Sequence, residues 1–107
     1  MTSNVNEYGQ TLRASIGEDV SNNIGLTFTL FLSRTGEKIE RNESQGVTVG
    51  TSTITVGDTV YAATKHLEYI VQEGDFLKSG NWRKKAAAKI SSSVEKIGNF
   101  ETFTVLA

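Results

Sequence analysis

The chain has 107 residues, a length typical of one domain with a single small core. Its 11 Lys and Arg against 12 Asp and Glu give a net charge of −1, which disfavours a protein that binds duplex DNA through a surplus of cations. With no cysteine and one histidine, the sequence excludes disulfide scaffolds, thiolate metal sites and multi-histidine sites, so we expect no metal and no cofactor.

The amino-acid composition favours a β protein. Thr, Val, Ile and Gly are abundant and proline is absent, which favours an all-β domain whose turns are made by Gly, Asn, Asp and Ser. The apolar stretches are too short to span a membrane, and residues 1–10 lack the basic and apolar regions of a signal peptide. We expect residues 1–7 to form a mobile arm and residues 8–107 a single domain.

Apolar residues at every second position predict the strands in chain order. Leu12, Ala14 and Ile16 form the first, before the turn-rich segment 17–23. The second runs over 26–32, with Leu26, Phe28, Leu30 and Leu32 on one face and Phe31 on the other. A tight connection at 34–37 follows, then a short strand at 47–49.

A hairpin is the clearest local signal. Two β-branched runs, 53–56 and 59–61, are separated by Gly57-Asp58. Gly at the first central position permits the positive φ that a two-residue hairpin turn requires. Beyond it, Leu67, Tyr69 and Val71 predict a strand, 74–80 a compact link bounded by glycines, and 100–105 a C-terminal strand.

One segment, 82–97, is compatible with two structures. Trp82, Ala86, Ile90 and Val94 lie four apart, as on one helix face. Trp82, Lys84, Ala86, Ala88 and Ile90 also alternate, and the serines at 91–93 are poor helix formers. We favour a strand over 82–90, with a turn at Gly98-Asn99 before the last strand; the helix is the alternative.

The candidate catalytic residues have simpler interpretations. His66 could act as a general base, but no nucleophile motif accompanies it, so we expect a half-exposed histidine at a strand edge. Glu18-Asp19 and Glu73 with Asp75 could bind a cation, yet they lie in predicted turns, where carboxylates cap backbone amides and stay solvated. No nucleophile, base and orienting group can be assembled, so we expect no enzyme and no catalytic residue.

A basic cluster beside an aromatic is the most function-like feature. Arg83, Lys84, Lys85 and Lys89 accompany Trp82, an arrangement that can follow a nucleic-acid backbone while a base stacks. The interpretation we favour places Trp82 in the core and the lysines on the outer face, where they discourage edge-to-edge association. Nucleic acid is therefore not the expected partner.

The order of turns and strands resembles a known group of proteins. Gly17-Glu18-Asp19-Val20-Ser21 matches a G-x-D-L-S-like turn with Val in place of Leu, the Gly57 hairpin follows, and Gly80-Asn81-Trp82 opens a late strand. Over residues 8–106 this order is similar to the small immunoglobulin-like β-sandwich structural proteins of tailed bacteriophages, and to the N-terminal domain of upper baseplate proteins. The Ala- and Lys-rich stretch 84–89 departs from that pattern.

The resemblance implies an immunoglobulin-like antiparallel β-sandwich of about seven strands. It implies a non-enzymatic subunit of the virion (capsid decoration, head fibre base, tail or baseplate), made in the host cytoplasm. Its partners would be other virion proteins and further copies of the chain. Phe31 and Ile70, apolar residues on polar strand faces, are the candidate contact residues, and the arm 1–6 could order on docking. The alternative is a sandwich module that binds carbohydrate through Trp82 and the three tyrosines, or single-stranded nucleic acid through the basic cluster.

Overall fold

The alternating segment Leu26–Leu32 forms an interior strand of the larger of two facing sheets. The computed structural model describes residues 2–107, which form an all-β fold of eleven strands and one 3₁₀ helix, η1 (Glu43–Gln45). The larger sheet follows the path β1 (Thr2–Asn4), β11 (Glu101–Leu106), β9 (Gly80–Ser91), β3 (Gly25–Leu32) and β4 (Glu37–Asn42), and β10 (Val94–Ile97) pairs with β9 beside it. The smaller sheet has the order β2 (Thr11–Ser15), β8 (His66–Ile70) and β5 (Val47–Val49).

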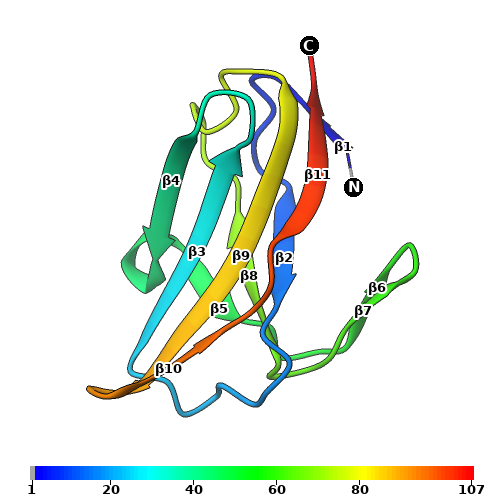
Figure 1. The fold of residues 1–107 in the computed structure, drawn as a ribbon. Helices are drawn as coiled ribbons and strands as arrows, with labels where there is room; N and C mark the ends of the chain where they lie inside the picture. The colour runs from blue at the N-terminus through cyan, green and yellow to red at the C-terminus, as the bar shows by residue number, and fades with distance from the viewer. Residues whose placement is uncertain (1) are drawn as a thin grey trace.

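A third sheet, of two strands, lies apart from the two facing sheets. β6 (Ile54–Val56) and β7 (Thr59–Tyr61) form a hairpin that projects from the side of the molecule (Figure 1). Val56 pairs with Thr59 across Gly57-Asp58, and Gly57 has φ +60°. The predicted two-residue turn is therefore confirmed.

The core lies between the two facing sheets. The inward residues of β3, predicted from their alternation, are all buried, as are Leu12 and Ala14 of β2 and Leu67 and Tyr69 of β8. Large and small side chains complement one another along β3 and β9, where Phe28 pairs with Ala86 and Leu26 with Ala88. The small alanines of β9 thus lie beside the large side chains of β3 on the inward face of the sheet.

The contested segment is a strand. β9 pairs antiparallel with β3 and with β11, and β10 continues it as a hairpin. Its residues alternate between buried and exposed from Trp82 onward, which a helix would not produce. β3 pairs with residues 82–89 on one side, and β11 and β10 pair with 80–84 and 87–91 on the other, so strand pairing outweighs the helix propensity of the alanines.

The link 71–79 completes the core from one end. Its Phe76 is fully buried, with ring centroids 5.5 Å from Trp82 and 5.7 Å from Phe103. The Trp82 indole Nε1 donates to the Lys78 carbonyl at 3.2 Å. The link expected at 74–80 lies within this segment, except that Gly80 already begins β9, and it also supplies an aromatic core residue.

Three expectations differ from the described structure. Eleven strands replace the expected seven or so, because β4 and β10, which lack clean alternation, and the short β1 were not anticipated. β1 pairs in parallel with β11, so the larger sheet is mixed, whereas the other described pairings are antiparallel. Thr2–Asn4, expected within a mobile arm, are thus part of a sheet edge, and Met1 lies outside the described residues. None of the segments in the described range is a helix long and apolar enough to cross a bilayer.

Candidate functional site

The basic residues of β9 do not form one patch, because neighbouring residues of a strand face opposite sides. Lys84 points inward with Trp82 and is buried, so the expectation that it lies on the outer face is wrong. Arg83 and Lys89 are exposed on the outer face, where Lys85 is half-buried. Trp82 is buried, which confirms its expected place in the core.

On the outer face the cations meet phenylalanines rather than the tryptophan. Phe31 and the exposed Phe100 lie with ring centroids 6.2 Å apart. The Arg83 guanidinium carbon lies 6.0 Å from the first ring centroid and 5.9 Å from the second, and Lys85 Nζ lies 4.7 Å from that of Phe100. Cation–π contacts therefore cover two aromatic rings on this surface.

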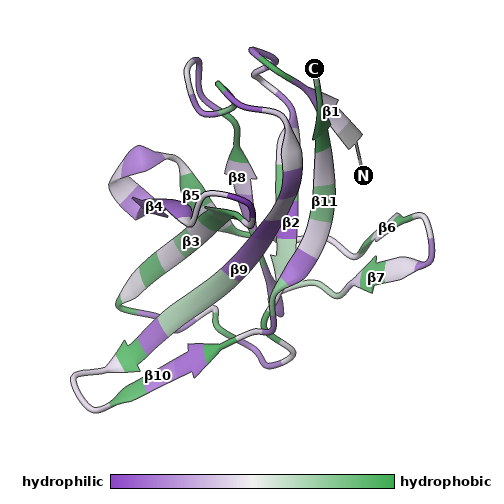
Figure 2. Ribbon diagram, turned by 45° about the horizontal axis from the view of Figure 1, so that its top comes forward, coloured by the Kyte–Doolittle hydropathy of each residue, from purple (hydrophilic) through white to green (hydrophobic). Residues whose placement is uncertain are grey.

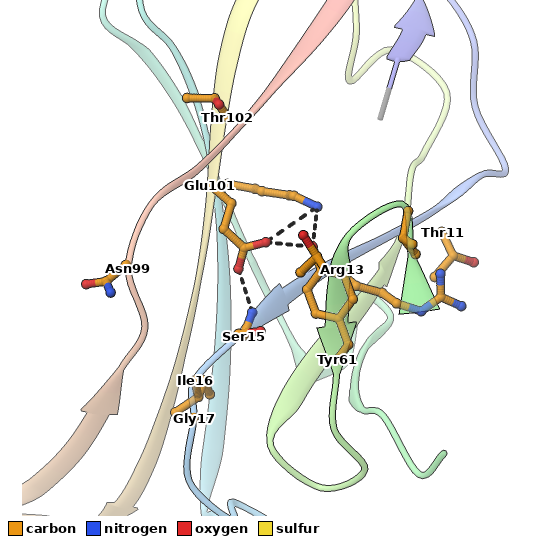
Figure 3. A pocket seen from close by; sticks show the side chains of 12 residues that line it. Thr11, Arg13, Ser15, Ile16, Gly17, Tyr61, Asn99, Glu101 and Thr102 are labelled. Carbon is orange, nitrogen blue, oxygen red and sulfur yellow. Dashed lines mark hydrogen bonds and ion pairs between the residues drawn. The ribbon is translucent and has the colours of Figure 1, made fainter. Parts of the chain in front are cut away.

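Lys84 is buried and belongs to a polar cluster at the base of the projecting hairpin, with Tyr61 and Glu101, which Figure 3 labels. Its Nζ donates to the Tyr61 hydroxyl at 3.3 Å and lies 3.9 Å from Glu101 Oε1. Tyr61 in turn donates to Glu101 Oε1 at 2.6 Å, and the Ser15 backbone N–H donates to Glu101 Oε2 at 2.7 Å. Four strands (β2, β7, β9 and β11) are thereby joined through one carboxylate.

Burial sets the electrostatics of this cluster. Loss of hydration lowers the pKa of Lys84, an effect that Glu101 opposes and Arg13 strengthens. Burial, then the hydrogen bond to Glu101, raises the pKa of Tyr61 well above its usual value. Tyr61 therefore remains a neutral hydrogen-bond donor over the ordinary pH range, and it holds the end of β7 to the body of the protein.

His66 extends the polar cluster on the smaller sheet. It is fully buried, so the expected half-exposed position is wrong, although it does begin β8 as predicted. Its Nδ1 lies 2.8 Å from the Ala62 carbonyl oxygen, and its Nε2 lies 3.3 Å from Glu68 Oε2, which also accepts from Arg13 Nε at 3.0 Å. Its ring packs against that of Tyr61 at 5.6 Å. The residues leading into and out of the hairpin bury the ring.

A cleft opens above the Lys84 cluster. It has a volume of about 600 Å³ and lies between β2, the hairpin and the segment that begins β11. The charged residues that line it are Lys84 together with Arg13 and Glu101, which Figure 3 labels. The hairpin contributes Val56, Thr59 and Tyr61 to one wall. The cleft is thus mixed in polarity, with two cations facing one carboxylate.

The acidic pairs take separate positions. Asp19 caps the turn at Ser21, whose backbone N–H donates to it at 2.9 Å, and Glu18 and Glu73 are exposed, as expected of turn carboxylates. Asp75 also caps its turn, accepting from the Gln72 N–H at 2.9 Å. It is buried rather than solvated, because Arg41 pairs with it at 2.8 Å and the Tyr69 hydroxyl donates to it. Within residues 2–107 no three acidic or histidine side chains converge as a metal site requires.

The two candidate contact residues and the candidate carbohydrate-binding aromatics lie on different parts of the molecule. Ile70 is exposed on the outer face of the smaller sheet, and Phe31 is half-buried beside Phe100. Of the residues expected to form a carbohydrate platform, Trp82, Tyr61 and Tyr69 are buried and Tyr8 alone is exposed. These four do not form a shared surface.

No pattern in the sequence predicted the contact between Tyr61 and Glu101. They are separated by 40 positions and meet only because the hairpin base folds against β11. The inward position of Lys84 could have been predicted, since it alternates in step with Trp82 and Ala86 along the strand.

Comparison of the chain with protein-family models, with curated proteins and with solved structures finds no match.

Proposed function

We propose that this protein is a non-enzymatic structural subunit that acts by symmetric association of its copies, and that it belongs to the virion of a tailed bacteriophage. The projecting hairpin β6–β7 carries the assembly part of this proposal. The virion part comes from the resemblance of residues 8–106 to small structural proteins of such phages. Other virion proteins would be the further partners, after synthesis in the host cytoplasm.

The hairpin is built as a contact element rather than as a protected edge. Each of its strands has one edge without a partner among the described residues. An isolated two-stranded hairpin is marginal in water, and exposed strand edges usually carry charges that prevent pairing. The edge strand β4 has such charges at Glu37, Lys38, Glu40 and Arg41. In contrast, residues 53–61 hold one charge, Asp58 at the tip, and Val60 is 59% exposed.

The strand pairing supports an immunoglobulin-like sandwich as the scaffold of this subunit. If β2 is taken as strand B, then β3, β4, β5, β8, β9 and β11 correspond to C, C′, D, E, F and G. The observed orders β11-β9-β3-β4 and β2-β8-β5 then read G-F-C-C′ and B-E-D. Trp82 near the start of β9 donates back to Lys78, as the tyrosine corner of such folds does.

Sedimentation of the purified protein tests the assembly proposal. We expect an oligomer at micromolar concentration that Val60→Lys converts to monomer, because a charge on the hairpin edge opposes strand pairing. Val94→Lys is the matched control, since Val94 is an exposed valine of the other hairpin, β9–β10. A monomeric native protein, or a Val60→Lys variant that stays oligomeric, would contradict the proposal.

Phe31 and Ile70 are secondary contact candidates. Ile70→Ser and Phe31→Ser should weaken the oligomer, or its binding to the particle, if these faces take part in it. An oligomer and a particle affinity unchanged by either variant would remove that residue from the interface.

Particle composition tests the virion proposal. We expect this chain in purified phage particles at a fixed ratio to the major capsid protein by quantitative mass spectrometry. A low ratio would place it at the neck or baseplate and a high one on the capsid surface. Its absence from particles would overturn the virion assignment and leave the assembly proposal standing on sedimentation alone.

One surface favours a second function, the binding of single-stranded nucleic acid. Phe31, Phe100, Arg83 and Lys85 form a mixed aromatic and basic patch on the outer face of the larger sheet, and aromatic rings with cations are the usual contacts to unpaired bases. Anisotropy of a labelled oligothymidine should rise on binding and fall steeply with salt. Phe100→Ala should lower the affinity about tenfold, since a stacked base contributes on the order of 1–3 kcal/mol. Tyr8→Ala, at an exposed aromatic elsewhere, should leave it unchanged.

A further inference from the structure

The outer edge of β2 is open where it borders the cleft. The Gln10 carbonyl accepts from Val71 N–H at 3.0 Å and Ile16 N–H donates to Lys65 at 2.9 Å, so the even-numbered residues of this segment hydrogen-bond toward β8. The odd-numbered residues therefore direct their backbone groups to the opposite side. There, Ser15 N–H is taken by Glu101. Among the described residues no strand pairs with the edge at Thr11 and Arg13.

The cleft beside this edge carries a small excess of positive charge that a partner could neutralise. Arg13 and Lys84 line it against the single carboxylate of Glu101, which is already engaged by Tyr61 and Ser15. The Arg13 side chain is 23% exposed, and its partner Glu68 does not line the cleft. An extended segment with one negative charge would match both the open backbone edge and this small excess of positive charge.

The hairpin has those properties. Its sole charge, Asp58, lies in the two-residue turn at the tip. In a two-residue hairpin the pairs next to the turn bond to each other, so the following residues, Thr55 and Val60, direct their backbone groups outward. The hairpin projects from the side of the molecule (Figures 1 and 2), and Val56, Thr59 and Tyr61 form one wall of the cleft in its own copy. Among the described residues neither of its strands pairs with β2, and the carboxylates paired with Arg13 and Lys84 are those of Glu68 and Glu101 rather than Asp58. Because a hairpin already serves as one wall of the cleft in its own copy, a hairpin strand that pairs with the open edge of β2 would come from a second copy.

We propose that the hairpin of one copy enters the cleft of the next, where its strand pairs with the open edge of β2 and the Asp58 carboxylate meets Arg13, with Lys84 behind it. This inference rests on the proposed assembly function and names the surface that receives the hairpin. The contact is head-to-tail, because the donor and acceptor surfaces differ. Repetition of such a contact produces a ring when its rotation closes and a filament when it does not.

Cysteine cross-linking tests the contact cleanly, because the chain has no cysteine of its own. A Thr11→Cys chain mixed with a Val60→Cys chain should form a mixed disulfide under mild oxidation, since paired strands bring Cβ atoms within about 5 Å. Thr11→Cys mixed with Val94→Cys is the matched control and should give none. Far-ultraviolet circular dichroism would establish that each variant retains the fold.

The outcomes separate the two proposals. A mixed disulfide between positions 11 and 60 supports the head-to-tail contact. A disulfide between two Val60→Cys chains, with none to position 11, would overturn it while leaving hairpin-mediated assembly intact, now as a two-fold contact. A monomeric protein without either disulfide would overturn both.

Charge exchange provides a second readout of the same contact. Asp58→Arg should weaken the oligomer about tenfold or more, and Arg13→Glu should do the same. Mixing these two variants should restore association between unlike chains, because each supplies the charge that the other lacks. Two weakened variants that do not recover on mixing would contradict the pairing of Asp58 with Arg13.

Discussion

Gly50 shows how a single buried histidine constrains its surroundings. A Cβ atom at position 50 would lie 1.9 Å from Nε2 of His66, so a side chain there would displace the imidazole or the strand that carries it. The His66 ring is in turn fully buried and held by Ala62 and Glu68. Glycine is therefore required at position 50 by packing.

We predict that Gly50→Ala destabilises the protein by about 3 kcal/mol or more, as overpacking of a filled core does. Gly25→Ala is the matched control, because a Cβ there would lie 3.9 Å from the nearest atom, the Cβ of Lys89, and should change stability by less than about 0.5 kcal/mol. Urea unfolding followed by the fluorescence of the single, buried Trp82 measures both. Equal stabilities of the two variants would contradict the close approach.

Tyr69 makes stability depend on alkaline pH. Burial, then its hydrogen bond to Asp75, raises the pKa of Tyr69 to about 12 from an ordinary 10.0. A raised pKa in the folded state gives a contribution that is complete below pH 10 and is lost as pH rises toward 12. We predict a fall in the free energy of unfolding on the order of 2 kcal/mol from this group over that range.

Tyr69→Phe should be less stable at neutral pH, because Asp75 and Arg41 lose a partner, and its stability should fall less between pH 10 and 12. Tyr8→Phe, at an exposed tyrosine, is the control. Urea titrations at intervals of half a pH unit would measure the slopes. A Tyr69→Phe variant with the native slope would show that another group is responsible.

The buried polar residues were the hardest to anticipate from sequence. Alternation correctly separates inward from outward positions in β3, and it contained the signal for Lys84. His66 and Asp75 are different, since segments distant in the chain cover them: the hairpin base covers the first, and Arg41 on β4 pairs with the second. Local patterns carry no information about such long-range coverage.

At the scale of elements, β9 is the strand on which the larger sheet depends. Its inward alanines, Ala86 and Ala88, are fully buried opposite Phe28 and Leu26, whereas Ala87 between them is half-exposed on the outer face. Three consecutive alanines thus occupy two environments. A helix would distribute them differently around its axis.

We predict that Ala88→Leu lowers the free energy of unfolding by about 1–3 kcal/mol through overpacking, and that Ala87→Leu changes it by less than about 0.5 kcal/mol. The two variants add the same atoms at neighbouring positions, so the difference between their free energies of unfolding measures the effect of placing a leucine on the inward rather than the outer face of β9. Thermal and urea unfolding would measure it. A larger loss for Ala87→Leu would contradict the register of β9 against β3.

The sequence predicted the elements with clear alternation and missed those without it. The strands β2, β3, β5, β8, β9 and β11 and the β6–β7 hairpin were all predicted. β4 escaped because Glu37–Asn42 is charged or polar at five of its six positions, as suits an exposed sheet edge. β10 was not predicted because it follows a run of serines and is largely exposed.

At the scale of the whole molecule, the N-terminal strand forms one edge of the larger sheet. Ser3 of β1 is buried, Val5 packs against the core, and Asn6 N–H donates to the Phe76 carbonyl at 2.7 Å. These contacts connect the start of the chain both to β11 and to the link that holds the aromatic cluster. We expect residues 2–6 to contribute to stability even without a partner protein.

We predict that deletion of residues 1–5 lowers the free energy of unfolding by about 2 kcal/mol or more, since it removes a paired strand and a buried side chain. Deletion of the exposed Ala107, which follows β11, is the control and should have little effect. Unfolding in urea would measure both. An unchanged stability after the first deletion would show that β1 adds nothing to the isolated protein.

Strand order and the parallel pairing of β1 lay beyond prediction. Both depend on which segments meet across the whole chain, and hydropathy patterns record only which face of each segment is apolar. The sequence did not indicate the cleft for the same reason, since its walls come from four separate parts of the chain.

The parallel pair β1–β11 also decides how the protein would respond to a pulling force. Thr2 pairs with Thr104 and Asn4 with Leu106, so the chain enters and leaves through adjacent strands that run in the same direction. Tension applied at the two ends would load the hydrogen bonds of this pair together in shear, whereas a hairpin would open one bond at a time. Rupture would then require several bonds to fail at once, including that from Val5 N–H to the Leu106 carbonyl at 2.7 Å. Forced unfolding is governed by such a barrier, so the fold is arranged to resist stretching along its length.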